Sequence, residues 1–132
     1  GRLDSIAVLA AAANAMTVGE MRQLSAHDAL DFSEADYYRL IDAKTASLMA
    51  AACELGALSG SPAHREAVRR FGWELGRGFQ IADDLLDYTA DSAVTGKPSG
   101  LDLREHKVTL PLIAVLPRLG ATERAEVDAL FR

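Results

Sequence analysis

Two helix-start signals, at Ser33 and at Ser61, divide the first two thirds of the chain into three long segments. Ser33 is followed three residues later by Asp36, which is the spacing of a capping box in its aspartate variant. Ser61 is followed by Pro62, a residue typical of the first position of a helix. None of the three segments shows the alternation of apolar and polar residues that marks a strand. The sequence therefore predicts long helices and no sheet.

The expected helices follow from these signals and from the Gly- and Pro-containing stretches farther along. They cover residues 5–26, 34–58, 62–93, 111–116 and 123–131, with Ser33, Ser61 and Thr122 as caps and a loop over 95–104. Short connections between helices favour antiparallel neighbours. We therefore expect an all-α antiparallel bundle that forms a single domain over residues 1–132.

Composition narrows the class of protein. With 132 residues, of which 49% are hydrophobic, the chain is long enough to bury one core. Its net charge of −5 argues against nucleic acid as a partner. Cys53 is the only cysteine, which favours a reducing cytoplasm over a disulfide-forming compartment. The longest uncharged stretch, 5–19, is too short to span a membrane, so no membrane span is expected.

Three carboxylates lie close together in the stretch FQIADDLLDYTADSAVTGKPSG, which occupies residues 79–100. Asp83 and Asp87 are four residues apart and share one helical face, and Asp84 adjoins them. Clustered carboxylates repel one another unless a cation lies between them, and oxygen ligands suit Mg²⁺. Because Mg²⁺ usually binds one or two carboxylates together with phosphates, the pattern predicts a phosphorylated ligand. An ordinary solvated acidic face explains the same spacing.

The helical face of Asp83 continues toward the N-terminus through Gln80, Gly76 and Gly72. Glycine inside a helix costs about 1 kcal/mol relative to alanine, which makes sense where something approaches the backbone closely. We expect this stripe to line a cavity. The large or apolar neighbours are expected to pack into the bundle; these are Phe71, Leu75, Phe79, Ala82 and Leu86.

Three lysines are candidates for holding an anion. Lys44 lies on a mostly apolar helical face, where it either extends its ammonium to water or points it into the predicted cavity. Lys97 lies in the loop after the acidic helix, but Pro98 excludes a nucleotide P-loop there. A loop lysine at this place could close over a bound diphosphate. Lys107 precedes a short helix, whose start favours anions.

Taken together, these stretches resemble the trans-isoprenyl diphosphate synthases. Residues 79–88 (FQIADDLLDY) resemble the second aspartate-rich motif of that family, and TGKP and GLDL resemble the loop that follows it. KVTLPLI at 107–113 resembles the next block, Lys44-Thr45 the lysine-threonine pair, and GEMRQL at 19–24 an upstream helix. The order and separations agree over nearly the whole chain. The combination is most similar to the long-chain polyprenyl members.

The resemblance implies a helix bundle of the isoprenoid synthase type and a prenyl-transfer reaction. An allylic diphosphate ionises, isopentenyl diphosphate attacks the allylic cation, and the chain grows by five carbons with Mg²⁺ as cofactor. By position, the resemblance implies that Asp83 binds Mg²⁺ directly and that Asp84 and Asp87 complete the metal site. It implies two further groups of residues. Those that contact the allylic diphosphate are Lys44, Lys97 and Lys107, and those near the reacting carbons are Thr45 and Gln80.

The chain also departs from the family pattern. The family has two aspartate-rich motifs on facing helices, and residues 1–82 contain no adjacent pair of aspartates. We therefore expect the C-terminal half of a synthase, truncated at its N-terminal side, that associates as a homodimer or with the missing half. A regulatory subunit and a terpene cyclase-like enzyme are the alternatives. His106 stands where the family usually has glycine, and we expect it to be an exposed loop residue.

Overall fold

The computed structural model describes residues 2–24, 29–89 and 100–131. In these ranges the elements are helical and none is a strand, as the sequence predicts. In chain order they are α1 (Arg2–Leu24), η1 (Ala29–Asp31), α2 (Glu34–Ile41), η2 (Asp42–Ala46), α3 (Ser47–Gly60), η3 (Pro62–His64), α4 (Arg65–Thr89), α6 (Leu101–Arg104), α7 (Leu110–Val115), η4 (Leu116–Arg118) and α8 (Ala121–Leu130). No helix within the three described ranges is both long enough and apolar enough to cross a membrane.

The chain divides into two compact units. Unit 1 comprises residues 1–25 and 38–80, and unit 2 comprises residues 26–37 and 81–132. The boundaries fall inside α2 and α4, so each of these two helices contributes one part to each unit. Each unit is described by itself below. That residues 1–132 form a single domain stays a prediction.

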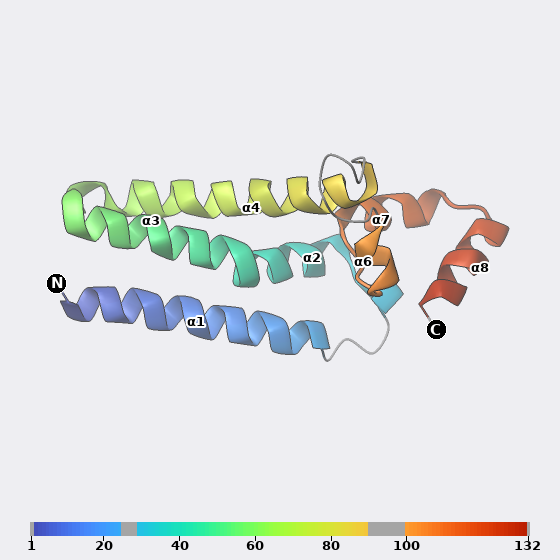
Figure 1. Cartoon of the computed structure of the whole chain (residues 1–132), viewed down its shortest axis with the longest axis horizontal. Coiled ribbons are helices and arrows are strands. Elements are labelled where there is room, and N and C mark those ends of the chain that lie inside the picture. The colour runs from blue at the N-terminus through green and yellow to red at the C-terminus, as the bar shows by residue number, and fades with distance from the viewer. Residues whose placement is uncertain (1, 25–28, 90–99, 132) are drawn as a thin grey trace. The chain divides into compact units, whose positions relative to one another are not determined.

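In unit 1, α3 lies between α1 and the N-terminal part of α4 (Figure 1). Small residues let these helices approach closely. A Cβ atom added to Gly72 would lie 2.6 Å from the carbonyl oxygen of Met49, and one added to Gly76 would lie 2.6 Å from Cα of Ala46. On α1, a Cβ atom on Gly19 would lie 2.9 Å from that of Ala43. The helices therefore pack backbone against backbone.

The predicted cavity along the glycine stripe is wrong. The stripe of Gly72 and Gly76 is buried against α3 and η2, because a helix face without side chains is the one that a neighbouring backbone can approach. The side chains expected to pack instead face solvent on the rest of α4. Their exposed fractions are 62% for Phe71, 49% for Leu75, 55% for Phe79 and 51% for Leu86, and Ala82 is exposed as well.

Unit 2 has a core of larger side chains. Val108, Leu112 and Leu116 are buried, and eight partly buried residues pack around them: Leu30, Phe32, Tyr88, Leu103, Ile113, Leu119, Val127 and Phe131. Among the described residues, this cluster is drawn from η1 and the residue after it, the end of α4, and the helices from α6 to α8 with the segments that connect and follow them. It surrounds the short helix α7, whose predicted position at 111–116 is confirmed to within one residue.

The predicted helix starts are confirmed in two cases of three. At Ser33, the hydroxyl accepts from the backbone N–H of Asp36 and the Ser33 N–H donates to the Asp36 carboxylate, which is the expected capping box. At Ser61, Pro62 begins η3 as expected, but the Ser61 hydroxyl pairs with the His64 ring and caps no backbone group. Thr122 is not a cap, because α8 begins at Ala121 and Thr122 is its second residue.

The cap of α8 is Gly120, whose backbone N–H donates to the Glu123 carboxylate at 2.9 Å. The expected loop over 95–104 is also wrong in its last part, because Leu101–Arg104 form α6. Gly100, which precedes α6, adopts a left-handed conformation with φ 73°, for which glycine is the natural residue. Residues 90–99 lie outside the described ranges, and with them the predicted end of the helix at 93.

Candidate functional site

Lys44 and Thr45 lie on η2, a π-helical segment that interrupts an otherwise continuous helix from Glu34 to Gly60. The Lys44 ammonium lies 2.7 Å from a carboxylate oxygen of Glu20 on α1, and both side chains are nearly half exposed. The side chain therefore extends to the surface, and its contact with an anion stays a prediction. Such an ion pair at the surface contributes little stability, so the ammonium can exchange partners.

Thr45 and Gln80 are in direct contact. The Thr45 hydroxyl donates a hydrogen bond of 2.8 Å to Oε1 of Gln80 on α4. The two residues are 35 positions apart in the sequence and both are partly buried in unit 1. The structure therefore brings together two of the residues that the resemblance places near the reacting carbons.

The three aspartates of α4 have different surroundings within unit 2. Asp83 is exposed. The Asp84 side chain is buried, with 6% of its surface exposed, and accepts a 2.5 Å hydrogen bond from the hydroxyl of Tyr37. Tyr37 is itself 1% exposed, so this hydrogen bond lies in the interior of the unit. The carboxylate of Asp84 is thus fixed, whereas that of Asp83 faces solvent.

Asp87 holds the start of α6. One of its carboxylate oxygens accepts from the backbone N–H of Leu101 at 3.2 Å and the other accepts from that of Asp102 at 3.1 Å. The Asp87 carbonyl oxygen also accepts from the N–H of Gly100 at 2.8 Å. Backbone N–H groups at a helix start have no partner inside the helix, and here a carboxylate satisfies them.

Asp102 is a fourth carboxylate near these three. Burial, followed by the negative charges of Asp87 and Asp84, raises the pKa of Asp102 to about 6. The ammonium of Lys107 lies 3.9 Å from the Asp102 carboxylate and opposes that shift. Lys107 is itself partly exposed and pairs with Glu105, and the hydrogen bond to Glu105 raises the Lys107 pKa. Unit 2 therefore carries a strongly negative cluster that would gain from a nearby cation.

The remaining candidates divide into those seen and those not seen. Lys97 lies outside the described residues. His106 is exposed, as expected, and adopts φ 56°, a left-handed conformation that favours glycine. Its ring centroid lies 5.7 Å from that of Phe131. The backbone at this position thus favours glycine, and this chain has histidine there.

The carboxylates of α4 suit an open Mg²⁺ site better than a metal site made entirely of protein ligands. Within the described ranges, no group of three or more His, Cys, Asp or Glu side chains is placed to hold a metal ion. Asp83 is exposed on the same helical face as Asp87, and Asp84 is turned to Tyr37. One or two carboxylates, with the remaining positions open to water and phosphate, are the donor set that Mg²⁺ accepts. The residues present therefore fit the predicted ion.

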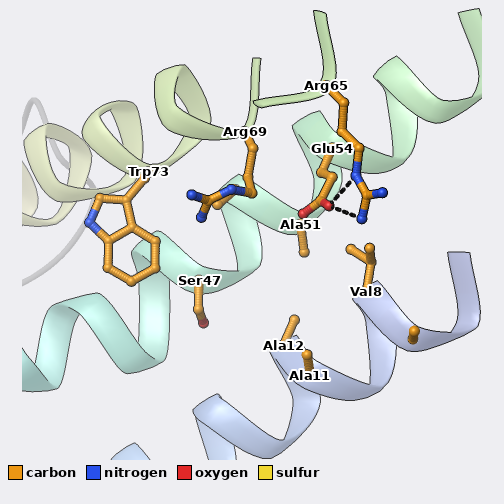
Figure 2. Close-up of a pocket in the computed structure, with 11 residues that line it drawn as sticks. Val8, Ala11, Ala12, Ser47, Ala51, Glu54, Arg65, Arg69 and Trp73 are labelled. Carbon is orange, nitrogen blue, oxygen red and sulfur yellow. Dashed lines mark hydrogen bonds and ion pairs between the residues drawn. The ribbon is translucent and has the colours of Figure 1, made fainter. Parts of the chain in front are cut away.

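A hollow of about 380 Å³ lies elsewhere in unit 1, between α1, α3 and the start of α4 (Figure 2). Its floor is apolar and includes Val8, Ala12 and Ala51. Two of the charged residues at its edge, Arg65 and Glu54, form an ion pair of 2.6 Å. This hollow contains none of the predicted site residues.

Several residues that shape the candidate site were not assigned a role from the sequence. Asp42 forms a two-pronged ion pair with Arg77, and Tyr37 binds Asp84. Each partner lies 35 or more positions away, so no local spacing indicates the contact. The only available signal was for Tyr37, an aromatic residue at the staple position of its helix start.

Comparison with known proteins adds an independent view. The family model described as Polyprenyl synthetase matches residues 1–132. The chain is 45% identical over 107 residues to the all-trans-nonaprenyl-diphosphate synthase (geranyl-diphosphate specific) of Rhodobacter capsulatus, which covers 80% of this chain and 33% of that protein. It is 40% identical over 129 residues to the octaprenyl diphosphate synthase of Escherichia coli (strain K12), which covers 96% of this chain and 40% of that protein.

A solved structure agrees with these matches. The crystal structure of a decaprenyl diphosphate synthase from Rhodobacter capsulatus superposes with a TM-score of 0.83 at 38% identity, covering 97% of this chain and 40% of that one. The match confirms the expected fold for the part of the chain that it covers. In each of these three comparisons, this chain spans between a third and two fifths of the length of the protein that it matches.

Proposed function

The chain belongs to the polyprenyl synthetase family, and from this membership we propose that it is part of a prenyltransferase acting on isopentenyl diphosphate and an allylic diphosphate. The allylic diphosphate ionises, and the double bond of isopentenyl diphosphate attacks the resulting cation. A proton then leaves, and the product is a trans-polyprenyl diphosphate five carbons longer. The relatives named above make long-chain products by name, and the proposal adopts that class for this chain.

The observation that carries the proposal is the hydrogen bond from Thr45 to Gln80. It ties the lysine-threonine pair of η2 to α4, the helix that also carries the three aspartates. Residues that are far apart in the sequence, and that match the family by position, are thereby joined by a contact. A chance resemblance of short motifs would not predict that contact.

Each site residue has a proposed role that follows from its chemistry. Lys44, Lys97 and Lys107 supply ammonium groups to the oxygens of the allylic diphosphate, where negative charge builds up as the bond to carbon breaks. Thr45 and Gln80 offer neutral polar groups near the reacting carbons. Because these groups are fixed before the reaction, they need not reorganise while the cation forms.

The metal site is proposed on α4. Asp83, which is exposed, would bind Mg²⁺ directly, and Asp84 and Asp87 would complete the site, in part through water molecules. When bound, Mg²⁺ neutralises the departing diphosphate. Tyr37 and the start of α6 hold Asp84 and Asp87 in place before any ion arrives. Burial and the nearby negative charges that raise the pKa of Asp102 are conditions under which a bound cation would lower the energy of the cluster.

We further propose that the chain associates, either with a second copy or with the remainder of the family fold. Large apolar side chains are exposed on α1 and α4, among them Leu3 at 81%, Ile6 at 63% and Phe71 at 62%. A contiguous exposed apolar surface is typical of sites that bind other protein. A cytoplasmic location is part of the same proposal and rests on the single cysteine.

A calorimetric titration with inorganic diphosphate, with and without Mg²⁺, tests the proposal on this chain. We expect binding that requires Mg²⁺ and that Asp83→Ala weakens by tenfold or more, since about 1.4 kcal/mol of lost interaction corresponds to tenfold. Glu126→Ala is the matched control, because Glu126 is an exposed carboxylate on α8 outside the site. The control should bind like the unaltered chain.

Equal losses in Asp83→Ala and Glu126→Ala would mean that net charge, and not a site, governs the binding. Absence of any Mg²⁺-dependent binding would contradict the claim that this chain holds the site by itself. Incubation with both substrates then separates the candidate activities. A prenyltransferase consumes isopentenyl diphosphate, a cyclase releases diphosphate without consuming it, and a regulatory subunit changes only the product length of another synthase.

A further inference from the structure

The π-helical segment η2 carries both Lys44 and Thr45. A π-helical turn contains more residues than an α-helical turn and is rarely stable by itself, so it persists where its surroundings hold it and often marks a functional site. If η2 relaxed to an α-helix, the helix on one side of it would rotate by about 100° relative to the other, the angle of one residue. The directions of Lys44 and Thr45 therefore depend on whatever keeps η2 in its present form.

Helix α4 contacts the first residue of η2 and its last two residues. Arg77 donates from Nε and Nη2 to the two carboxylate oxygens of Asp42, at 2.6 and 2.7 Å. Thr45 donates to Gln80, as described above. Gly76 lets the α4 backbone approach Ala46 closely. The Asp42 contact is the one with both charge and a fixed geometry.

The surroundings of Arg77 restrict its guanidinium group further. The group lies 5.8 Å from the ring centroid of Tyr38 and 5.9 Å from that of Trp73. The side chains of Arg77 and Asp42 are 35% and 20% exposed, so the pair is better shielded than a surface ion pair. A planar guanidinium that grips both carboxylate oxygens defines an orientation, which a lysine ammonium cannot do.

We propose that Arg77 is a positioning residue, which holds η2 in its π-helical form through Asp42 and thereby sets where Lys44 and Thr45 point. The inference rests on the proposed function, because that function gives Lys44 and Thr45 their contacts with the substrate. Among the described residues, Arg77 pairs with Asp42 and Glu74 and lies over the rings of Tyr38 and Trp73, and none of these four is a predicted site residue. It acts through the shape of the neighbouring segment.

Two variants of Arg77 and one matched control test the inference. Arg77→Met removes the charge and both hydrogen bonds, and Arg77→Lys keeps the charge but not the two-pronged grip. Arg69→Met is the control. Arg69 lies two turns earlier on α4 and grips Glu66 with two hydrogen bonds of 3.0 and 2.7 Å, but that pair lies within α4 and does not involve η2. Figure 2 shows Arg69 at the edge of the hollow described above.

Two measurements are made at a temperature where every variant is folded. The first is hydrogen exchange of the amides of residues 42–46, and the second is the affinity for inorganic diphosphate with Mg²⁺. We expect Arg77→Met to accelerate the exchange and to weaken the affinity by about tenfold each, the effect of losing about 1.4 kcal/mol. Arg77→Lys should fall between Arg77→Met and the unaltered chain. Arg69→Met should change each quantity by less than about twofold, as expected for an exposed pair within one helix.

Unchanged exchange at residues 42–46 in both Arg77 variants would overturn the inference. So would equal losses of diphosphate affinity in Arg77→Met and Arg69→Met, because the pair would then act only through general helix stability. If the unaltered chain binds no diphosphate, the proposal that this chain holds the site by itself fails, and hydrogen exchange alone then supports or overturns the role of Arg77. If Arg77→Met does not fold, the comparison of Arg77→Lys with the control decides.

Discussion

The helices of the two units pack in different ways, through close backbone contact in unit 1 and through large apolar side chains in unit 2. In unit 1, α4 meets α3 and η2 where side chains are missing, with Gly72 against the backbone of Met49 and Gly76 against that of Ala46. In unit 2, α7 is surrounded by large apolar side chains, and its Leu112 is one of the three buried residues of the cluster. Close backbone contact leaves no room for added atoms, whereas a core of large side chains cannot lose atoms without a cavity. The same kind of mutation should therefore have opposite consequences in the two units.

Removal of atoms should have its largest effect in unit 2. Leu112 is 7% exposed, and Leu112→Ala should lower the free energy of unfolding by about 3.5 kcal/mol through lost burial and a residual cavity. Urea unfolding followed by circular dichroism measures this loss. Leu130→Ala is the control, because Leu130 is 53% exposed and should change the stability by less than about 0.5 kcal/mol. Similar losses in the two variants would show that unit 2 is not held by this cluster.

Addition of atoms should have its largest effect in unit 1. The Cβ atom of Gly76→Ala would lie 2.6 Å from Cα of Ala46, so α4 must move away, at a cost of about 2.5 kcal/mol. Gly78→Ala is a matched control two residues along the same helix, with no atom within 4 Å of the new Cβ. This control should gain up to about 1 kcal/mol of stability from helix propensity alone. If the two variants shift the urea midpoint in the same direction, the close approach of the helices is not real.

The two units also differ in whether their partly buried charges are neutralised by a partner. Arg77 and Asp42 neutralise each other in unit 1, whereas Asp102 in unit 2 has a pKa raised from 3.8 to about 6. The folded state binds the Asp102 proton more tightly than the unfolded state, so ionised Asp102 destabilises the fold above pH 6 and this penalty fades as the pH falls toward 4.

Asp102→Asn should therefore be more stable than the unaltered chain at pH 7, by about 2 kcal/mol more than at pH 4. Unfolding of both proteins by urea at the two pH values, without divalent cations, gives this difference directly. Asp31→Asn, at an exposed position on η1, serves as the control and should change the stability by less than about 0.5 kcal/mol. A stability difference that is the same at both pH values would contradict the raised pKa.

The smallest expected effect concerns the backbone of unit 2. His106 has φ 56°, and a residue with a side chain pays about 1 kcal/mol for that conformation compared with glycine. His106→Gly should raise the stability by somewhat less than this value, because glycine also gains freedom in the unfolded chain. Thermal unfolding measures the gain. A loss of stability would mean that the contact between the His106 and Phe131 rings outweighs the backbone strain.

The sequence predicted helices more successfully than it predicted which face each helix buries. Capping signals are local, so Ser33 and Pro62 could be read correctly from their neighbours. The glycine face of α4 was interpreted as the lining of a cavity, but a neighbouring backbone occupies it. The spacing of the glycines indicates a close approach and does not distinguish a ligand from another helix. The partners of Asp42 and Asp84 depend on which helices become neighbours, and no spacing in the chain encodes that arrangement.

The close contact of α3 and α4 also has a chemical consequence. Cys53 is the only cysteine of the chain, and its sulfur lies 2.8 Å from the point where a Cβ atom of Gly72 would stand. The thiol is half-buried at this interface, so an alkylating reagent reaches it more easily whenever the two helices separate. Because Cys53 is the only thiol in the chain, any modification by the reagent can be attributed to this residue. The rate of Cys53 alkylation thus reports how often α4 separates from the helix that carries Cys53.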